Sequence, residues 1–181
     1  MPEGNELYEK YHDEEWGRPV RDDQKIFEFL VLESAQAGLS WLTVLRKREN
    51  YRKAFKNFNY KVIAKWGEKE IQKLLGNAGI IRNRAKVSAA INNAKRFLEV
   101  QKEFGTFAKY IWGFVGSKPI KNKRTSLKDL PAKTEISDAL ALDLKKRGFK
   151  FLGSTVIYAH MQATGMVNDH LENCFRKKER R

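Results

Sequence analysis

The sequence predicts an all-α protein, because apolar residues recur at helical spacing along most of its 181 residues and alternation of apolar and polar residues is scarce. Hydrophobic residues make up 41% of the chain, which is enough to form a core and argues against global disorder. The length fits one compact domain or two small lobes. Because no repeat or low-complexity block divides the chain, we treat residues 1–181 as a single domain.

Eight segments have the helical pattern. We expect helices at 22–36, about 41–54, 60–66, 68–75, 84–104, 106–114, from Thr134 or Ser137 to about Arg147, and from about Ser154 to Thr164. Residues 115–131 contain two of the four prolines and several basic residues, so we expect an exposed loop between lobes there. The basic tail at 176–181 is expected to be disordered.

The ends of these helices follow from capping residues and helix breakers. Asp22 or Asp23 can cap the first helix, and Gly38 ends it. The Gly-Asn-Ala-Gly stretch at 76–79 stops the helix at 68–75. The long helix that follows carries an apolar stripe at i, i+3, i+4 and i+7 spacing, as expected for a helix with one face in the core.

The chain is strongly basic. It has 36 Lys and Arg residues against 22 Asp and Glu, which favours a polyanionic partner such as nucleic acid or an anionic membrane; the alternative is a basic protein with a well-solvated surface. The single cysteine, Cys174, excludes an internal disulfide and fits a reducing compartment. No apolar run reaches the roughly 20 residues of a membrane span, and the polar N-terminus is no secretory signal. We expect a soluble, intracellular, cytoplasmic protein that binds no membrane.

An acidic residue inside an apolar stretch is the clearest candidate for function. Glu33 lies in Phe27-Glu-Phe-Leu-Val-Leu-Glu-Ser-Ala35, where a carboxylate must be paired, protonated or matched with a positive ligand. Gly38 and Trp41 follow within two helical turns, so this segment predicts a pocket for a flat, electron-poor ligand carried on a polyanion. The alternatives are an acid satisfied by an arginine or a helix N-terminus, and a tryptophan that only packs in the core.

Two expected helices near the C-terminus are joined by a short turn with Gly148 and Gly153 at its ends. In a helix-hairpin-helix, Gly153 lets a phosphate approach the backbone, and the amides of Ser154 and Thr155 point outward at a helix N-terminus. Four basic residues surround this spot: Lys145, Lys146, Arg147 and Lys150. Such a hairpin positions a duplex without reading its sequence, and the alternative is an ordinary αα-hairpin that binds nothing.

Six motifs follow one another along the chain. They are Tyr8-Glu-Lys-Tyr-His-Asp-Glu-Glu-Trp-Gly17, Leu32-Glu-Ser-Ala-Gln-Ala-Gly-Leu-Ser-Trp41, Arg48-Glu-Asn-Tyr51, Asn77-Ala-Gly-Ile-Ile-Arg82, Lys145-Lys-Arg-Gly-Phe-Lys-Phe151 and Asn168-Asp-His170. Together they resemble the 3-methyladenine DNA glycosylase I family, from Tyr8 to Cys174. The resemblance implies the helix-hairpin-helix glycosylase fold, with two helical lobes and the base pocket between them.

The resemblance also implies a DNA repair enzyme that flips 3-methyladenine out of duplex DNA and hydrolyses its N-glycosidic bond, leaving an abasic site. Glu33 would contact the flipped base, and Tyr8, Tyr11 and Trp41 would shape the pocket and stack in it. The residues that would contact DNA are Gly38, Leu39, Lys146, Lys150, Gly153, Ser154 and Thr155. No lysine stands out as a Schiff-base nucleophile, so we expect a monofunctional monomer without strand cleavage.

A structural zinc site is a further implication, although the chemistry needs no cofactor. His12, His170 and Cys174 match three of the family's four ligands. In the family a Cys-Gly-Trp segment precedes the first motif, and the printed chain holds no counterpart of its cysteine or its aromatic residue. Asp169 or a water could complete the site; the alternative is two ordinary histidines and a free thiol.

The other acids carry less information. Asp13, Glu14 and Glu15 are interpreted as a solvated or capping cluster. Asp169 is interpreted as a structural residue, although other helix-hairpin-helix glycosylases carry a catalytic Asp in that region. Three other functions stay open: a non-catalytic DNA-binding module of the same fold, a glycosylase for another altered base, and a structural RNA-binding protein.

Overall fold

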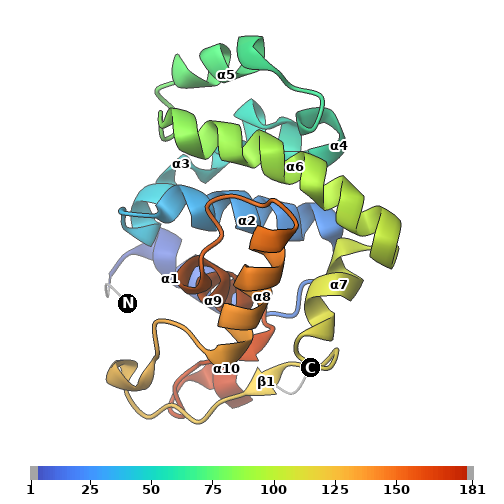
Figure 1. The fold of residues 1–181 in the computed structure, drawn as a ribbon. Coiled ribbons are helices and arrows are strands. Elements are labelled where there is room, and N and C mark those ends of the chain that lie inside the picture. The colour runs from blue at the N-terminus through green and yellow to red at the C-terminus, as the bar shows by residue number, and fades with distance from the viewer. Residues whose placement is uncertain (1–3, 179–181) are drawn as a thin grey trace.

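The computed structural model describes residues 4–178, and this part of the chain is mostly helical (Figure 1). Its helices are α1 (Glu6–Glu14), α2 (Asp23–Gln36), α3 (Trp41–Ala54), α4 (Tyr60–Ile63), α5 (Glu68–Leu75), α6 (Arg84–Phe104), α7 (Phe107–Gly113), α8 (Glu135–Lys146), α9 (Ser154–Ala163) and α10 (Phe175–Lys178). Its shorter elements are the 3₁₀ turns η1 (Lys56–Phe58) and η2 (Leu127–Asp129) and the strands β1 (Ile120–Lys121) and β2 (Val167–Asn168). The predicted all-α class is confirmed.

All eight expected helices are present, and the capping residues explain their starts. The side chain of Asp22 accepts a hydrogen bond from the Lys25 amide and caps α2. Asp23, the other candidate cap, instead accepts hydrogen bonds from the amides of Phe107 and Ala108, at 2.8 Å each, and so ties α2 to the start of α7.

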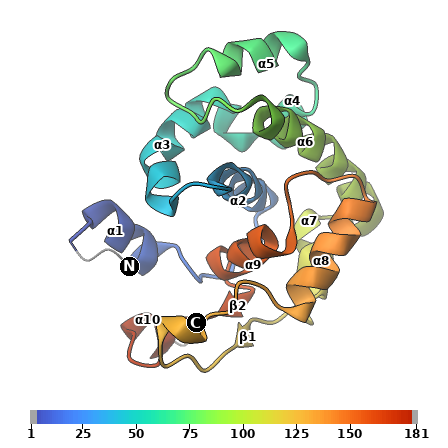
Figure 2. The ribbon, with the colours of Figure 1, turned by 60° about the vertical axis from the view of Figure 1, so that its left-hand side comes forward.

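Helix α2 runs through the middle of the molecule. Every residue from Ile26 to Ala35 is buried, as expected for a helix that is covered on all sides. Figure 2 looks nearly along α2 and shows α3, α4 and α6 on one side of it, with α7 and α9 on the other. These two groups are the two helical lobes, and the residues at the C-terminal end of α2 lie between them.

Three features differ from the expectation. α1 was not assigned as a helix; its N-cap is Asn5, whose side chain accepts from the Tyr8 amide. The loop at 115–131 contains β1, which pairs in parallel with β2 and so joins the loop to the C-terminal segment. The prediction of a disordered tail is wrong for residues 176–178, which lie in α10, where Arg176 is buried. Residues 179–181 lie outside the described part.

No helix among residues 4–178 is both long enough and apolar enough to span a lipid bilayer.

Candidate active site

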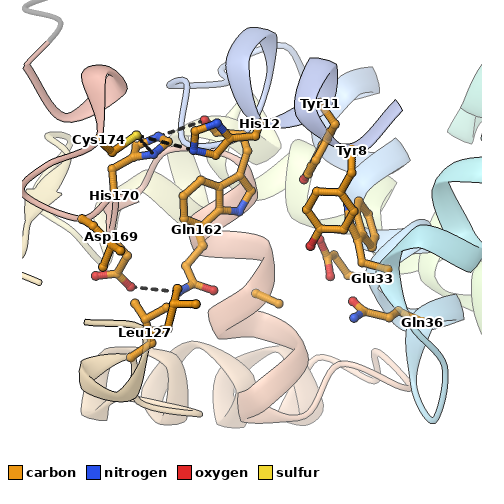
Figure 3. Close-up of a pocket in the computed structure, with 15 residues that line it drawn as sticks. Tyr8, Tyr11, His12, Glu33, Gln36, Leu127, Gln162, Asp169, His170 and Cys174 are labelled. Atoms are coloured by element: carbon orange, nitrogen blue, oxygen red, sulfur yellow. Dashed lines mark hydrogen bonds between the residues drawn. The ribbon is translucent and has the colours of Figure 1, made fainter. Parts of the chain in front are cut away.

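A cavity of about 380 Å³ opens between α1, the end of α2, the start of α3 and α9 (Figure 3). Residues from all four helices line it, among them Tyr8, Tyr11, Glu33, Gln36, Trp41 and Gln162. The volume falls in the range of small-molecule sites. The structure therefore brings together the four residues for which the sequence predicts contact with the base, Tyr8, Tyr11, Glu33 and Trp41, although they come from three different helices.

Glu33 is a buried acid with no partner among residues 4–178. The residue is 4% exposed, and neither the side chains nor the backbone of this part of the chain form a hydrogen bond or ion pair with its carboxyl group. The arginine or helix N-terminus of the alternative interpretation is therefore not found in this part of the chain. Burial raises the pKa of Glu33 to about 8. A carboxyl in this state is neutral at pH 7 and becomes charged readily when a cation enters the cavity.

Three aromatic side chains surround this carboxyl. The rings of Tyr11 and Trp41 lie 5.3 Å apart, and the Tyr8 ring meets Tyr11 edge to face at 6.4 Å. Burial, and then the nearby Glu33 carboxyl, raise the pKa of both tyrosines, so their hydroxyls stay protonated and can donate. The buried indole N–H of Trp41 has no hydrogen-bond acceptor in the described structure. The cavity thus offers aromatic faces, unused donors and, in Glu33, an acid with no partner among residues 4–178.

The turn between α2 and α3 lies beside the cavity. Gly38 has φ = +80°, a conformation that favours glycine, and Leu39 is 42% exposed. The ammonium group of Lys86 on α6 donates to the carbonyls of Ala35 and Ala37, at 2.9 and 2.6 Å. These bonds satisfy carbonyls at the C-terminus of α2 and hold the turn in place.

The hairpin between α8 and α9 has the expected geometry at its glycines. Gly148, with φ = +84°, follows the end of α8, and Gly153 provides no side-chain cap for α9, so the first amides of α9 stay open. No atom lies within 4 Å of the position that a Cβ of Gly153 would occupy. Lys146, Lys150 and Thr155 are exposed around this spot. The Ser154 hydroxyl bonds to Ser137 at 2.8 Å, so only its amide faces outward.

Arg147 does not belong to this basic cluster. Its guanidinium group donates to Glu103 and Asp143 and lies over the rings of Phe104 and Tyr110, at 5.1 and 5.0 Å from their centres. The charge of Arg147, which was expected at the phosphate site, is therefore neutralised by two carboxylates of the protein itself.

Two asparagines of α6 hold the hairpin turn. The Asn93 side chain donates to the carbonyl of Lys150 and accepts from its amide, at 2.8 Å in both cases. Asn92 donates to the carbonyl of Gly148, also at 2.8 Å. Neither residue was predicted from the sequence, because two asparagines inside a long helix give no signal of a contact more than 50 positions away.

Three potential metal ligands meet at the edge of the cavity. The donor atoms of His12, His170 and Cys174 all lie within 4.8 Å of one another, and the Cys174 sulfur is 3.6 Å from Nε2 of His12 and from Nδ1 of His170. Zinc bond lengths of about 2.3 Å to sulfur and about 2.0–2.1 Å to nitrogen place two ligands of a tetrahedral site about 3.5 Å apart. These residues therefore fit a zinc ion.

In each of the two histidines, one ring nitrogen forms a hydrogen bond that leaves the other ring nitrogen facing the sulfur of Cys174. Nδ1–H of His12 donates to Asp13 at 2.7 Å, and Nε2–H of His170 donates to the carbonyl of Trp16 at 3.3 Å. This is the arrangement that orients zinc-binding histidines. Gly17 allows it, because a Cβ there would lie 2.7 Å from Nε2 of His170.

Asp169 has the structural role that the sequence analysis favoured. One of its oxygens accepts from Asn122 and Arg124, and the other accepts from Tyr158 and Gln162. Because all four lone-pair positions of the carboxylate are occupied, Asp169 has no capacity left to act as a base or to join a metal site. It fastens the loop at 115–131 to α9 and to the segment that carries His170.

Glu15 corrects the interpretation of the acidic cluster at 13–15. Both of its carboxylate oxygens accept hydrogen bonds from Arg48, so it is part of a buried ion-pair network instead of a solvated group.

Comparisons with known proteins show to which family this chain belongs. The sequence profile of the methyladenine glycosylase family matches residues 1–177. The chain belongs to this family. It is 51% identical to the DNA-3-methyladenine glycosylase of Haemophilus influenzae, over 93% of this chain and 91% of the relative. It is 48% identical to DNA-3-methyladenine glycosylase 1 of Escherichia coli, over 93% and 90%.

A solved structure shows the same fold. A variant of 3-methyladenine DNA glycosylase I in complex with 3-methyladenine superimposes with a TM-score of 0.95, is 34% identical and is matched over 96% of its length and 98% of this chain. The family assignment based on the six motifs is therefore confirmed. The roles of individual residues are not tested by these similarities and stay predictions.

Several cavity residues were not predicted as site residues. Trp16 and Gln36 lie inside quoted motifs, so the motifs themselves could have indicated them. Gln162 and Leu127 carry no sequence signal, because α9 and η2 reach the cavity only through the tertiary fold.

Proposed function

We propose that this protein excises 3-methyladenine from duplex DNA by flipping the base into the cavity and hydrolysing its N-glycosidic bond. The observation that carries the proposal is the unpaired Glu33 carboxyl between the aromatic rings of Tyr8, Tyr11 and Trp41. The family relation and the names of the relatives support the same activity.

The leaving group explains why so few catalytic groups are needed. 3-Methyladenine carries a positive charge on its glycoside, so it departs without a strong general acid. The protein has to extrude the base, hold it and stabilise the charge that develops on the sugar. Aromatic rings stabilise a desolvated cation by about 0.5–2 kcal/mol, and a charge-assisted hydrogen bond adds about 1.5–3 kcal/mol.

The state of Glu33 provides discrimination between damaged and normal adenine. With a pKa of about 8, ionising this carboxyl at pH 7 costs only about 1.4 kcal/mol. A cationic base in contact with Glu33 offsets that cost, whereas neutral adenine does not, and adenine must also be unpaired from thymine.

The α8–α9 hairpin and the α2–α3 turn are proposed to hold the duplex. The open amides at the start of α9 fit a backbone phosphate, and Lys146 and Lys150 add charge. Leu39, exposed on its turn, is placed to occupy the gap that the flipped base leaves. α9 links the two functions, because it begins at the proposed phosphate site and carries Gln162 into the cavity about 13 Å further on.

Zinc is proposed as a structural ion bound by His12, His170 and Cys174, which would join α1 to the C-terminal segment. When bound, the ion would contribute folding energy rather than chemistry. Both histidines come already oriented by Asp13 and by the Trp16 carbonyl. No step of base excision is assigned to it.

Mass analysis of the bases released from methylated duplex DNA tests the proposed function. We expect 3-methyladenine to appear, with abasic sites left in an unbroken strand, and no adenine from unmethylated DNA. Duplex binding without any base release would favour a non-catalytic module. Release of a different altered base would show a shifted specificity, and strand cleavage would overturn the monofunctional assignment.

A further inference from the structure

Helix α1 carries Tyr8 and Tyr11, two aromatic residues that line the cavity, and also His12, whose ring contacts His170 in the C-terminal segment. It is nine residues long, and it packs mainly against α3. Figure 2 shows α1 apart from the central helices, beside α3 and near α10. A helix of this length does not hold its place through its own stability. The distance between Tyr8 and Tyr11 on α1 and Trp41 on α3 must therefore be set by specific contacts.

Arg48 provides such a contact from inside α3. Its Nη1 and Nη2 atoms donate to the two carboxylate oxygens of Glu15, at 2.8 Å each, in a pair of parallel hydrogen bonds. Its Nε donates to Glu28 on α2, also at 2.8 Å. One guanidinium group thus joins three segments: the end of α1, the buried α2 and the helix that begins with Trp41.

The position of Glu15 makes this contact decisive for α1. Glu15 directly follows the last residue of α1, and its amide donates to the carbonyl of Tyr11 at 3.0 Å. Any movement of Glu15 is therefore transmitted to the turn that carries Tyr11. The guanidinium group of arginine is planar and its donors have a fixed spacing, so two parallel hydrogen bonds fix both the position and the orientation of a carboxylate. The ammonium group of lysine cannot do this.

The centre of the network, formed by Arg48 and Glu28, is buried, whereas Glu15 and Lys25 are partly exposed. Arg48 and Glu28 are each 6% exposed, and Lys25 lies 3.1 Å from both Glu15 and Glu28. Buried ion pairs of this kind are weak evidence for stability, because desolvation offsets much of the attraction, and fixing a geometry is their best-supported use. Arg48 itself does not line the cavity.

We propose that Arg48 is a positioning residue for base recognition, acting through Glu15 to set the separation of α1 from α3 across the cavity. This inference rests on the proposed function, since it assumes that Tyr8, Tyr11 and Trp41 close on the base. Arg48 belongs to the motif Arg48-Glu-Asn-Tyr51, which follows the motif that carries Glu33 and Trp41. The positioning role gives this arginine a function in the same site.

Three variants separate positioning from simple stabilisation. Arg48→Lys keeps the positive charge but loses the paired hydrogen bonds to Glu15. Glu15→Gln keeps the size of the side chain but loses its negative charge. Arg52→Lys is the matched control, because Arg52 also bonds to Glu28, at 3.0 Å, but does not touch Glu15. For each variant and the unchanged protein, we would measure the affinity for free 3-methyladenine by calorimetry, the affinity for undamaged duplex and the melting temperature.

We expect Arg48→Lys and Glu15→Gln to bind 3-methyladenine about tenfold more weakly at a temperature well below melting, with unchanged duplex affinity. Arg52→Lys should bind the base as the unchanged protein does, even if its melting temperature falls. If Arg48→Lys does not fold, Glu15→Gln still tests the positioning role. The Glu15 side chain is 33% exposed, so we expect this variant to fold.

Unchanged base affinity in Glu15→Gln, or an equal loss in Arg52→Lys, would overturn the positioning role. If the unchanged protein itself does not bind 3-methyladenine, the proposed function fails and this inference fails with it. Binding by the unchanged protein together with unaffected variants overturns the inference alone.

Discussion

Replacing Glu33 with glutamine should abolish a pH dependence that the buried carboxyl imposes on base excision. In the unchanged protein burial raises the pKa of Glu33 to about 8, and no group in the described part of the chain pairs with it. If the carboxylate is the form that holds the cationic base, kcat/KM must rise as pH increases toward 8. Glutamine has nearly the same shape and does not titrate, so its profile should lack this rise.

The size of the effect follows from the pKa. Between pH 6 and pH 8 the ionised fraction of a group with pKa 8 rises from about 1% to about 50%, so kcat/KM should increase about fiftyfold. At pH 8 the variant loses a charge-assisted contact of about 1.5–3 kcal/mol, which lowers excision about tenfold to a hundredfold. Affinity for the duplex should change far less, because Glu33 lies inside the cavity.

Single-turnover excision of 3-methyladenine under subsaturating conditions, measured from pH 6 to pH 8 for both proteins, is the assay. Duplex affinity measured across the same range removes any contribution from DNA binding. A flat or falling profile in the unchanged protein, or the same rising profile in Glu33→Gln, would refute the role of the carboxylate.

The same substitution should stabilise the fold. The folded protein keeps a proton on Glu33 between pH 4.5 and about 8, whereas the unfolded chain loses it near 4.5, so stability falls as pH rises through this window. From pH 4.5 to pH 7 is about 2.5 pH units, and each unit costs the folded state about 1.4 kcal/mol. At pH 7 the free energy of unfolding of Glu33→Gln should therefore exceed that of the unchanged protein by up to about 3 kcal/mol. The gain should vanish below pH 4.5, which urea unfolding at both pH values measures.

Three further outcomes are expected. Gly153→Val should weaken duplex binding without unfolding the protein, because no residue other than its two chain neighbours lies within 4 Å of the added Cβ. Lys146→Ala or Lys150→Ala should each reduce the steepness of the plot of log affinity against log salt concentration by about 0.9. Unchanged slopes would mean that the DNA binds elsewhere. Asn93→Asp, which loses its bond to the Lys150 carbonyl, should lower duplex affinity but leave 3-methyladenine binding intact, and a reduced base affinity would contradict this. Protein purified without added zinc should retain the metal and Cys174→Ser should lose it; a zinc-to-protein ratio near zero, with melting unaffected by chelator, would show that no site forms.

Local signals were sufficient to predict most of the fold. The cap and breaker of α2 and the glycines that end α5 lie within a few residues of the helices they bound, so sequence spacing reveals them. α1 consists mostly of charged residues, and α10 and the strand pair β1–β2 are only four and two residues long, so none shows a clear apolar stripe. Their positions depend on contacts with distant segments, such as the one between Arg48 and Glu15.

The residues that line the candidate site were predicted from the sequence, but the residues that hold them in place were not. Glu33, Tyr8, Tyr11 and Trp41 lie in motifs, and the structure places them around one cavity. The groups that hold them in place are spread over the chain. Lys86 and Asn93 act on backbone carbonyls more than 45 positions away, and no local pattern marks a long-range side-chain contact to backbone.

The most direct test of the central claim is whether 3-methyladenine binds between Trp41 and Glu33. The indole N–H of Trp41 is buried and has no acceptor within residues 4–178, whereas that of Trp112 donates to the carbonyl of Val20 at 2.8 Å, away from the cavity. In ¹⁵N-labelled protein, titration with 3-methyladenine should shift the Trp41 indole resonance and leave that of Trp112 in place. A saturating shift elsewhere, with the Trp41 resonance unmoved, would contradict the proposed site.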